Sequence, residues 1–116
     1  RLGDVARANI PLSLHSDMPM APASPLELMH AAVNRVNYAN KVAGPNQRIS
    51  ALAALMGVTL NAAYTINLEE DYGSISVGKY ANFTILSDSP LEVNPLEIKV
   101  IQVKGTVVEG RIFSKK

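Results

Sequence analysis

The sequence predicts an α/β chain in which helices come first and β-strands last. The composition changes near residue 66, from a part rich in Ala, Leu, Met and Asn to a part rich in Ile, Val, Gly and Lys. The spacing of apolar residues changes at the same place, from a helical period to short runs bracketed by glycines. With 116 residues, 47% of them hydrophobic, the chain has the size and composition of one domain with one core.

The composition also excludes several classes of function. Eleven Lys and Arg against ten Asp and Glu leave a net charge of +1, which gives no basis for binding nucleic acid or a membrane surface. The chain has no cysteine, so disulfides, thiolate zinc sites and cysteine nucleophiles are excluded. No apolar run approaches the ~20 residues that span a bilayer, and the first residues lack the apolar stretch of a signal peptide. We therefore expect a soluble chain, with the cytoplasm favoured as its location.

The first 25 residues contain a helix, a strand and a loop. Residues 1–9 have helical apolar spacing. Pro11 then opens a short run that we interpret as a strand ending at Asp17. Residues 18–25 include three prolines, which exclude a regular helix or ladder and indicate a stiff loop.

Two helical segments follow this loop. Ser24 before Pro25 predicts the start of a helix that runs to about Tyr38. Its apolar face would consist of Leu26, Met29, Ala32, Val33 and Val36.

The second segment is a broken helix. Ser50 predicts its cap, Gly57 an interruption, and Thr59 the cap of a further turn or two through Tyr64. Its inward face would consist of Leu52, Leu55 and Met56.

Strands occupy the last third of the chain. Glu109-Gly110 predicts a two-residue hairpin turn, and residues 87–95, which contain two prolines, an irregular connection. The apolar runs that predict strands are 83–86, 100–103, 107–108 and 112–113.

Common catalytic fingerprints are absent, and the polar triplet His15-Ser16-Asp17 is the strongest candidate for chemistry. Side chains alternate along a strand, so His15 and Asp17 would share one face and Ser16 the other, which excludes a nucleophilic triad among the three. A metal-binding or general-base role for Asp17 fits this position. The alternative is that Asp17 only caps the turn through Met18-Pro19.

His30 lies on the first of the predicted long helices. With His15 and Asp17 it could complete a set of two histidines and one carboxylate, but nothing in the sequence brings it near them. A solvent-facing histidine is the simpler interpretation.

Six short motifs occur in one order along nearly the whole chain. They are the Ser-Asp pair and proline loop (15–25), Ala-Val-Asn-Arg (32–35), Gln-Arg-Ile-Ser (47–50), Thr-x-Asn-Ala-Ala (59–63), Gly-Ser-Ile-x-x-Gly-Lys-x-Ala (73–81) and Thr-Val-Val-x-Gly-Arg (106–111). Together they resemble the C-terminal end of metal-dependent amidohydrolases, in particular the subgroup of N-acyl amino acid and imidazolone-type hydrolases.

This resemblance implies the end of a (β/α)8 TIM barrel in residues 1–66, with the eighth strand and its helix at about 10–38. Residues 67–116 would then be strands of a small composite β-sandwich, the two parts forming one compact unit. The resemblance also implies a divalent metal, usually zinc, and hydrolysis of non-peptide carbon–nitrogen bonds in a small-molecule substrate. Asp17 aligns with the strand-eight aspartate that contacts the metal and acts as general base. His15 has no fixed role in the family, but its place beside Asp17 could let it line the pocket.

Two departures from the family pattern limit this transfer. Asn82 stands where the family usually has Asp. The other metal ligands of the family belong to strands that would lie upstream of Arg1. We therefore expect a C-terminal fragment that is inactive by itself and holds no metal, and whose unpaired strand edges favour a homo-dimer.

Three alternatives stay open. The parent protein could be a regulatory or binding protein built on the same fold. The chain could be an independent module with a structural or binding role. It could also hold its own metal with His15, Asp17 and His30.

Overall fold

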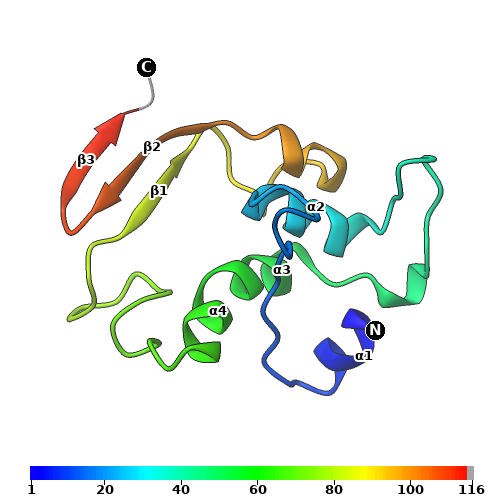
Figure 1. The fold of residues 1–116 in the computed structure, drawn as a ribbon, viewed down its shortest axis with the longest axis horizontal. Helices are drawn as coiled ribbons and strands as arrows, with labels where there is room; N and C mark the ends of the chain where they lie inside the picture. The colour runs from blue at the N-terminus through cyan, green and yellow to red at the C-terminus, as the bar shows by residue number, and fades with distance from the viewer. Residues whose placement is uncertain (115–116) are drawn as a thin grey trace.

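The α-helices come first along the chain and an antiparallel sheet lies at its end, as the sequence predicts (Figure 1). The computed structural model describes residues 1–114. The elements in chain order are α1 (Leu2–Arg7), α2 (Pro25–Asn34), the 3-10 helix η1 (Pro45–Gln47), α3 (Ala51–Val58), α4 (Leu60–Thr65), β1 (Phe83–Leu86), the 3-10 helix η2 (Pro95–Val100), β2 (Val103–Val108) and β3 (Arg111–Ser114).

Helix α2 begins where the sequence predicts and ends earlier. The Ser24 hydroxyl oxygen accepts a hydrogen bond from the Glu27 amide at 3.4 Å, and Pro25 occupies the first turn. The helix ends at Asn34, not near Tyr38, because Arg35 takes a left-handed conformation with φ 56°. Val36, predicted on the helix face, instead forms a β-bridge with Val42.

The break between α3 and α4 lies at Thr59 and not at Gly57, which is the seventh of eight residues in α3. Ser50 caps α3 as predicted, accepting from the Ala53 amide at 3.1 Å. Thr59 stands at the start of α4, but its hydroxyl donates back to the Leu55 carbonyl at 2.7 Å and caps nothing. The predicted hydroxyl cap of α4 is therefore wrong.

The inward face of α3 is also not the predicted one. Leu52 and Met56 are 56% and 37% exposed, whereas Ala54 and Gly57 are buried. Leu55 packs partly buried against the core, as predicted. Small residues face inward because they let other segments approach the helix backbone closely.

The core surrounds α2 and reaches η2. Met29 of α2 and Ile98 of η2 are 1% and 0% exposed. The remaining buried members of this cluster are Ala32, Val33, Ile49 and Ala54. Because Ile98 packs here, the predicted strand at 100–103 is mostly wrong: Val100 ends η2, and β2 begins at Val103.

The sheet has the order β1-β2-β3 with antiparallel pairing throughout. Phe83 pairs with Val107, and Val108 pairs with Arg111 across the hairpin. The two-residue turn Glu109-Gly110 has φ values of 48° and 81°, which confirms the predicted hairpin and matches its preferred type I′ geometry.

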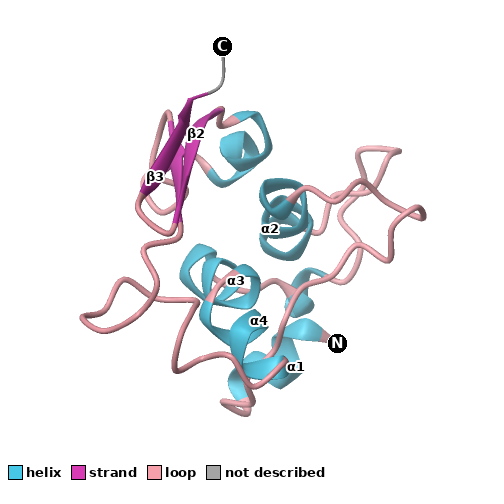
Figure 2. Cartoon of the chain, turned by 60° about the vertical axis from the view of Figure 1, so that its left-hand side comes forward, coloured by secondary structure: helices cyan, strands magenta, loops and turns pink. Residues whose placement is uncertain are grey.

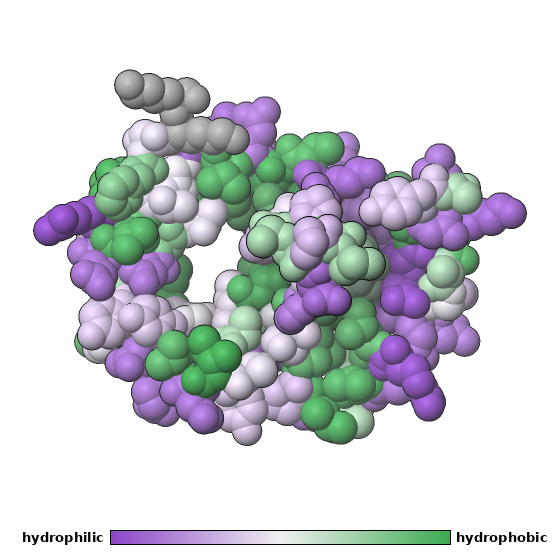
Figure 3. All heavy atoms as spheres, viewed as in Figure 1, coloured by the Kyte–Doolittle hydropathy of each residue, from purple (hydrophilic) through white to green (hydrophobic). Residues whose placement is uncertain are grey.

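The sheet stands at one end of the molecule, joined to α2 through η2 (Figure 2). The space-filling view shows an opening between the sheet and the helical part (Figure 3). Consistent with this, large apolar side chains on the strands stay exposed: Phe83, Ile85, Val108, Ile112 and Phe113. In the described residues, no helix has the length and apolar character to cross a membrane, and the longest, α2, has ten residues.

Candidate functional site

The segment that leads to Asp17 is extended but is not a strand. Residues 10–17 pair with no strand among the described residues, so the prediction of a β-strand here is wrong for this structure. The Leu14 amide donates to the Gly57 carbonyl at 2.8 Å, and Asn61 Nδ2 donates to the Leu12 carbonyl at 3.1 Å. Helices α3 and α4 therefore hold this segment in place of a sheet.

Gly57 is the point of closest approach between this segment and α3. A Cβ atom at Gly57 would lie 3.1 Å from Leu14 Cγ and 3.4 Å from the Leu12 carbonyl oxygen. The absence of a side chain therefore allows the extended segment to lie directly on the helix backbone.

The chain turns sharply at Asp17. Asp17 has φ 52°, and its carbonyl accepts from the Met20 amide at 2.8 Å. Its own amide donates to His15 Nδ1 at 2.7 Å. The turn is therefore closed by main-chain atoms and the His15 ring, and the Asp17 carboxylate is not its cap.

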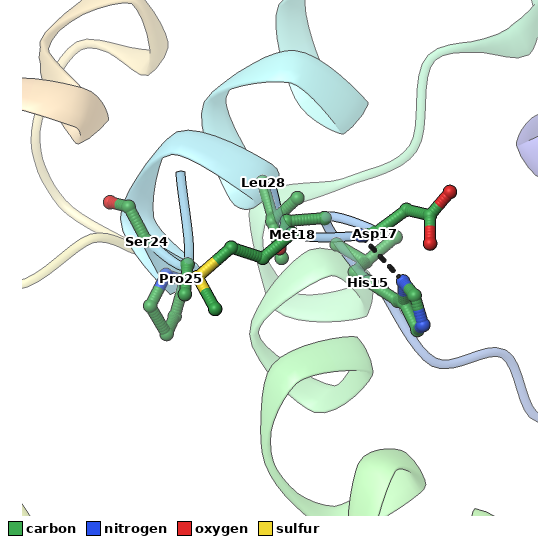
Figure 4. Close-up of a pocket in the computed structure, with 9 residues that line it drawn as sticks. His15, Asp17, Met18, Ser24, Pro25 and Leu28 are labelled. Atoms are coloured by element: carbon green, nitrogen blue, oxygen red, sulfur yellow. Dashed lines mark hydrogen bonds between the residues drawn. The ribbon is translucent and has the colours of Figure 1, made fainter. Parts of the chain in front are cut away.

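The structure brings the side chains of His15 and Asp17 together, on one side of the loop (Figure 4). Because His15 Nδ1 accepts a hydrogen bond, a neutral ring carries its proton on Nε2 and presents a donor to the outside. A neutral ring in this form has no lone pair left for a metal. The geometry thus favours a pocket-lining and positioning role for His15 over a ligand role.

Asp17 and His15 line a cavity of about 560 Å³ between the extended segment and the start of α2. The other lining residues are Leu14, Ser16, Met18, Ala23, Ser24, Pro25 and Leu28. Both Asp17 and His15 are exposed, and within residues 1–114 the Asp17 carboxylate makes no hydrogen bond or ion pair. This carboxylate is therefore free to meet a cation or a proton donor.

His30 does not join the other two candidate ligands. It lies on α2 with Nδ1 at 3.1 Å from Asn34 Nδ2, facing η2. His30 is partly buried, so the expectation of a solvent-facing histidine is wrong. This burial, and after it the positive charge of Lys99, lowers the pKa of His30.

The part of the chain that the structure describes contains no group of three His, Cys, Asp or Glu side chains placed to hold one metal ion. A self-contained site made by His15, Asp17 and His30 is therefore wrong for these residues. The free carboxylate of Asp17 fits one ligand position of a divalent ion, but a complete site does not fit within these residues.

Sequence reasoning identified Asp17 and His15 but missed the residues that build the cavity around them. Ser24 and Leu28 come from α2, and Met18 from the proline loop. The Ser24-Pro25 pair, which predicts the start of α2, is the one local signal for the side of the cavity that α2 forms. The contact of Leu14 with Gly57, which positions the loop, has no local signal.

Comparison with known proteins places the chain in a family. A model of the amidohydrolase family matches residues 1–113. The chain is 35% identical over 85 residues to N-substituted formamide deformylase of Arthrobacter pascens. The aligned region covers 73% of this chain and 16% of that protein. It is 41% identical over 80 residues to Protein LONG AFTER FAR-RED 3 of Arabidopsis thaliana, covering 68% of this chain and 14% of that protein.

A third relative is imidazolonepropionase of Christiangramia forsetii, 30% identical over 77 residues, which is 66% of this chain and 19% of that protein. The chain thus spans less than a fifth of the length of each of these three relatives. The resemblance noted in the sequence is confirmed at the level of the family, and by these matches the chain belongs to the amidohydrolase family.

Proposed function

We propose that this chain forms the C-terminal part of a metal-dependent hydrolase that cleaves non-peptide carbon–nitrogen bonds in small molecules. The observation that carries the proposal is the exposed carboxylate of Asp17, unpaired among the described residues, on a residue that lines a 560 Å³ cavity. Family membership supports the reaction class, and two of the relatives are named as a formamide deformylase and an imidazolonepropionase. The finer assignment to the subgroup of N-acyl and imidazolone-type hydrolases is part of the proposal.

The proposed enzyme needs a divalent ion, zinc in the first instance, which when bound supplies Lewis acidity at the scissile carbonyl. Asp17 would offer its carboxylate as one ligand, and the other ligands would come from residues outside this chain. Residues 1–66 would then close a (β/α)8 barrel, and residues 67–116 would belong to a β-sandwich completed by further strands. On this proposal the isolated chain is inactive.

Asp17 has the properties of a general base in this reaction. Its carboxylate accepts a proton as a water oxygen bonds to the carbonyl carbon, and returns that proton to the nitrogen as the carbon–nitrogen bond breaks. Its amide is held by His15 Nδ1 at 2.7 Å and its carbonyl by the Met20 amide at 2.8 Å, so the carboxylate projects from a fixed backbone. His15 positions Asp17 and lines the pocket.

The test is Asp17→Asn in the full-length protein, assayed against N-formyl, N-acyl and cyclic amide substrates. We expect the turnover number to fall by about 10²- to 10⁴-fold, because the amide cannot accept the proton, while the melting temperature stays unchanged. Asp88→Asn is the matched control, since Asp88 is also exposed but lies outside the cavity. Unchanged turnover in Asp17→Asn would contradict the assignment and favour a regulatory or binding protein on this fold.

Metal content tests the other half of the proposal. The chain of residues 1–116, purified and dialysed against traces of zinc, iron and manganese, should hold no stoichiometric metal by elemental mass spectrometry. The full-length protein should hold at least one ion per chain. One tightly bound ion in residues 1–116 alone would show that the chain carries its own site.

A further inference from the structure

A second cavity, of about 640 Å³, lies between the start of α2 and the stretch that leads from η2 into β2. Its polar lining consists of Ser24, Lys99, Gln102 and Lys104 and includes no carboxylate. We call this cavity the lysine groove. It touches the Asp17 cavity only at Ser24, and neither Asp17 nor His15 lines it.

The free polar groups of the lysine groove are donors. Lys104 Nζ donates to Gln102 Oε1 at 2.7 Å, which leaves the Gln102 amide hydrogens available. The Ser24 hydroxyl oxygen already accepts from the Glu27 amide, so its hydrogen is available too. In residues 1–114 every ion pair involves Asp4 with Arg1 or Arg7, so neither lysine of the groove has a carboxylate partner.

The two sides of the groove are held in position by backbone contacts. The Gln102 carbonyl accepts from the Ser87 amide at 2.9 Å, and the Gln102 amide donates to the Ser87 hydroxyl at 3.0 Å. On the other side, Ser24 is fixed as the N-cap of α2. A ligand would therefore meet walls whose backbone is already ordered, which lowers the entropic cost of binding.

An apolar surface continues the polar one. Leu26, Ile101 and Val103 complete the lining, and Ile101 is itself buried in the fold. The volume is in the range of small-molecule sites, roughly 300–1,000 Å³, and such sites combine an apolar wall with a few placed polar groups. The lining thus suits a ligand with one charged end and one apolar end.

We infer that the lysine groove binds a small organic anion, a carboxylate carried on an apolar body of a few carbon atoms. The two ammonium groups and the Gln102 amide meet the carboxylate oxygens, and the three apolar side chains meet the body. The site needs neither a metal nor Asp17, so it stands or falls independently of the hydrolase proposal.

The test uses ¹⁵N-labelled protein titrated with three probes in separate series: hexanoate, its neutral analogue hexanamide, and inorganic phosphate. We expect hexanoate to give saturable shifts of the Gln102 side-chain and backbone signals, with weaker binding at higher salt. Hexanamide should bind at least about fivefold more weakly, because it has no charge for the lysines. Phosphate should also bind more weakly, because it has no apolar body.

Variants separate this site from general attraction of anions. The double substitution K99Q/K104Q should weaken hexanoate binding by about fivefold or more, with an unchanged circular dichroism spectrum. Lys41→Gln is the matched control, because Lys41 is an exposed lysine outside the groove, and it should leave the affinity unchanged. Absence of saturation, equal binding of hexanamide or phosphate, or an equal effect of Lys41→Gln would overturn the inference.

Discussion

Asn34 Nδ2 donates a hydrogen bond to the Pro95 carbonyl at 2.7 Å and so joins the end of α2 to the start of η2. Asn34 is 7% exposed and is the polar side chain that the described core buries. The same nitrogen lies 3.1 Å from both Nδ1 and the carbonyl oxygen of His30. The side-chain amide of Asn34 thus links η2, which leads into the sheet, to the helical part of the chain. The apolar packing of Ile98 in the core adds to this link.

Replacing Asn34 should therefore destabilise the whole fold. Asn34→Asp keeps the size of the side chain but removes the donor, and it leaves the part-buried Pro95 carbonyl without this partner. We expect a loss of about 1–3 kcal/mol in the free energy of unfolding, measured by urea denaturation. Asn46→Ala is the control, since Asn46 is exposed and its side chain makes no hydrogen bond within residues 1–114. A loss no larger than that of the control would show that the amide does not join the two parts.

Gly57→Ala tests what positions the Asp17 loop. Alanine is the better helix former by about 1 kcal/mol, so helix propensity alone predicts stabilisation. The new Cβ would, however, lie 3.1 Å from Leu14 Cγ, and overpacking of this kind costs about 1–3 kcal/mol. We expect a net loss of about 1 kcal/mol in the free energy of unfolding and, in the hydrolase proposed above, reduced turnover through the displaced Asp17.

A double-mutant cycle with Leu14→Ala shows whether this contact is the cause. If Leu14 and the new methyl group collide, the two substitutions together should cost less than the sum of their separate effects. If the losses of stability from the two substitutions simply add, the effect of Gly57→Ala does not come from its contact with Leu14.

The elements that the sequence predicts correctly carry their signal within a few neighbouring residues. In the first turn of α2 the Ser24 hydroxyl accepts a hydrogen bond from a free amide, and Pro25 has no amide hydrogen that would need a partner. In the hairpin turn Glu109 and Gly110 supply two positive φ angles in a row. His15 and Asp17 come together for the same reason, because they are two residues apart. Such features need no partner from elsewhere in the chain.

The elements that the sequence predicts wrongly depend on partners that are distant along the chain. The extended segment 10–17 has strand-like residues but becomes a strand only beside another strand, and here it lies on Gly57 and Asn61. Val100 looks like a strand residue, yet burial of Ile98 against α2 makes this stretch a 3-10 helix. The metal site proposed above would be equally hard to predict from local patterns, since metal ligands usually come from several elements.

Asp4 should make stability depend on pH in the acidic range. A hydrogen bond from Gln47 Nε2, at 3.1 Å, and then one from Arg1 hold the pKa of Asp4 at about 2, below its ordinary 3.8. Because the folded state favours the ionised form, this stabilisation is present above pH 3.8 and is lost as the pH falls towards 2. Asp4→Asn should reduce the change in melting temperature with pH in that window, and Asp88→Asn should not. An unchanged acid profile in Asp4→Asn would contradict this role.

His30 should also lower the stability of the fold as the pH falls, but at a higher pH than Asp4 does. Its pKa lies below the ordinary 6.5 because of burial and then of the charge on Lys99, so the folded state favours the neutral ring. Above pH 6.5 both states are neutral; as the pH falls below this value, the unfolded state takes up the proton first and stability declines. His30→Gln should reduce this decline in melting temperature, and Lys99→Gln should reduce it in part. A decline of equal size in His30→Gln would assign it to another group.

The exposed edge of β3 leads us to propose that the isolated chain forms a homo-dimer by strand pairing. In a two-residue hairpin the Val108–Arg111 pair exchanges its hydrogen bonds, so the amide of Ile112 points to the free edge. Ile112→Pro should then remove an edge donor while keeping the bonds to β2, and it should shift dimerisation to a higher concentration in light scattering. Ile112→Ala keeps that amide and should shift dimerisation less, because it removes only apolar contact. A monomer at all concentrations, or equal effects of the two substitutions, would contradict pairing through this edge.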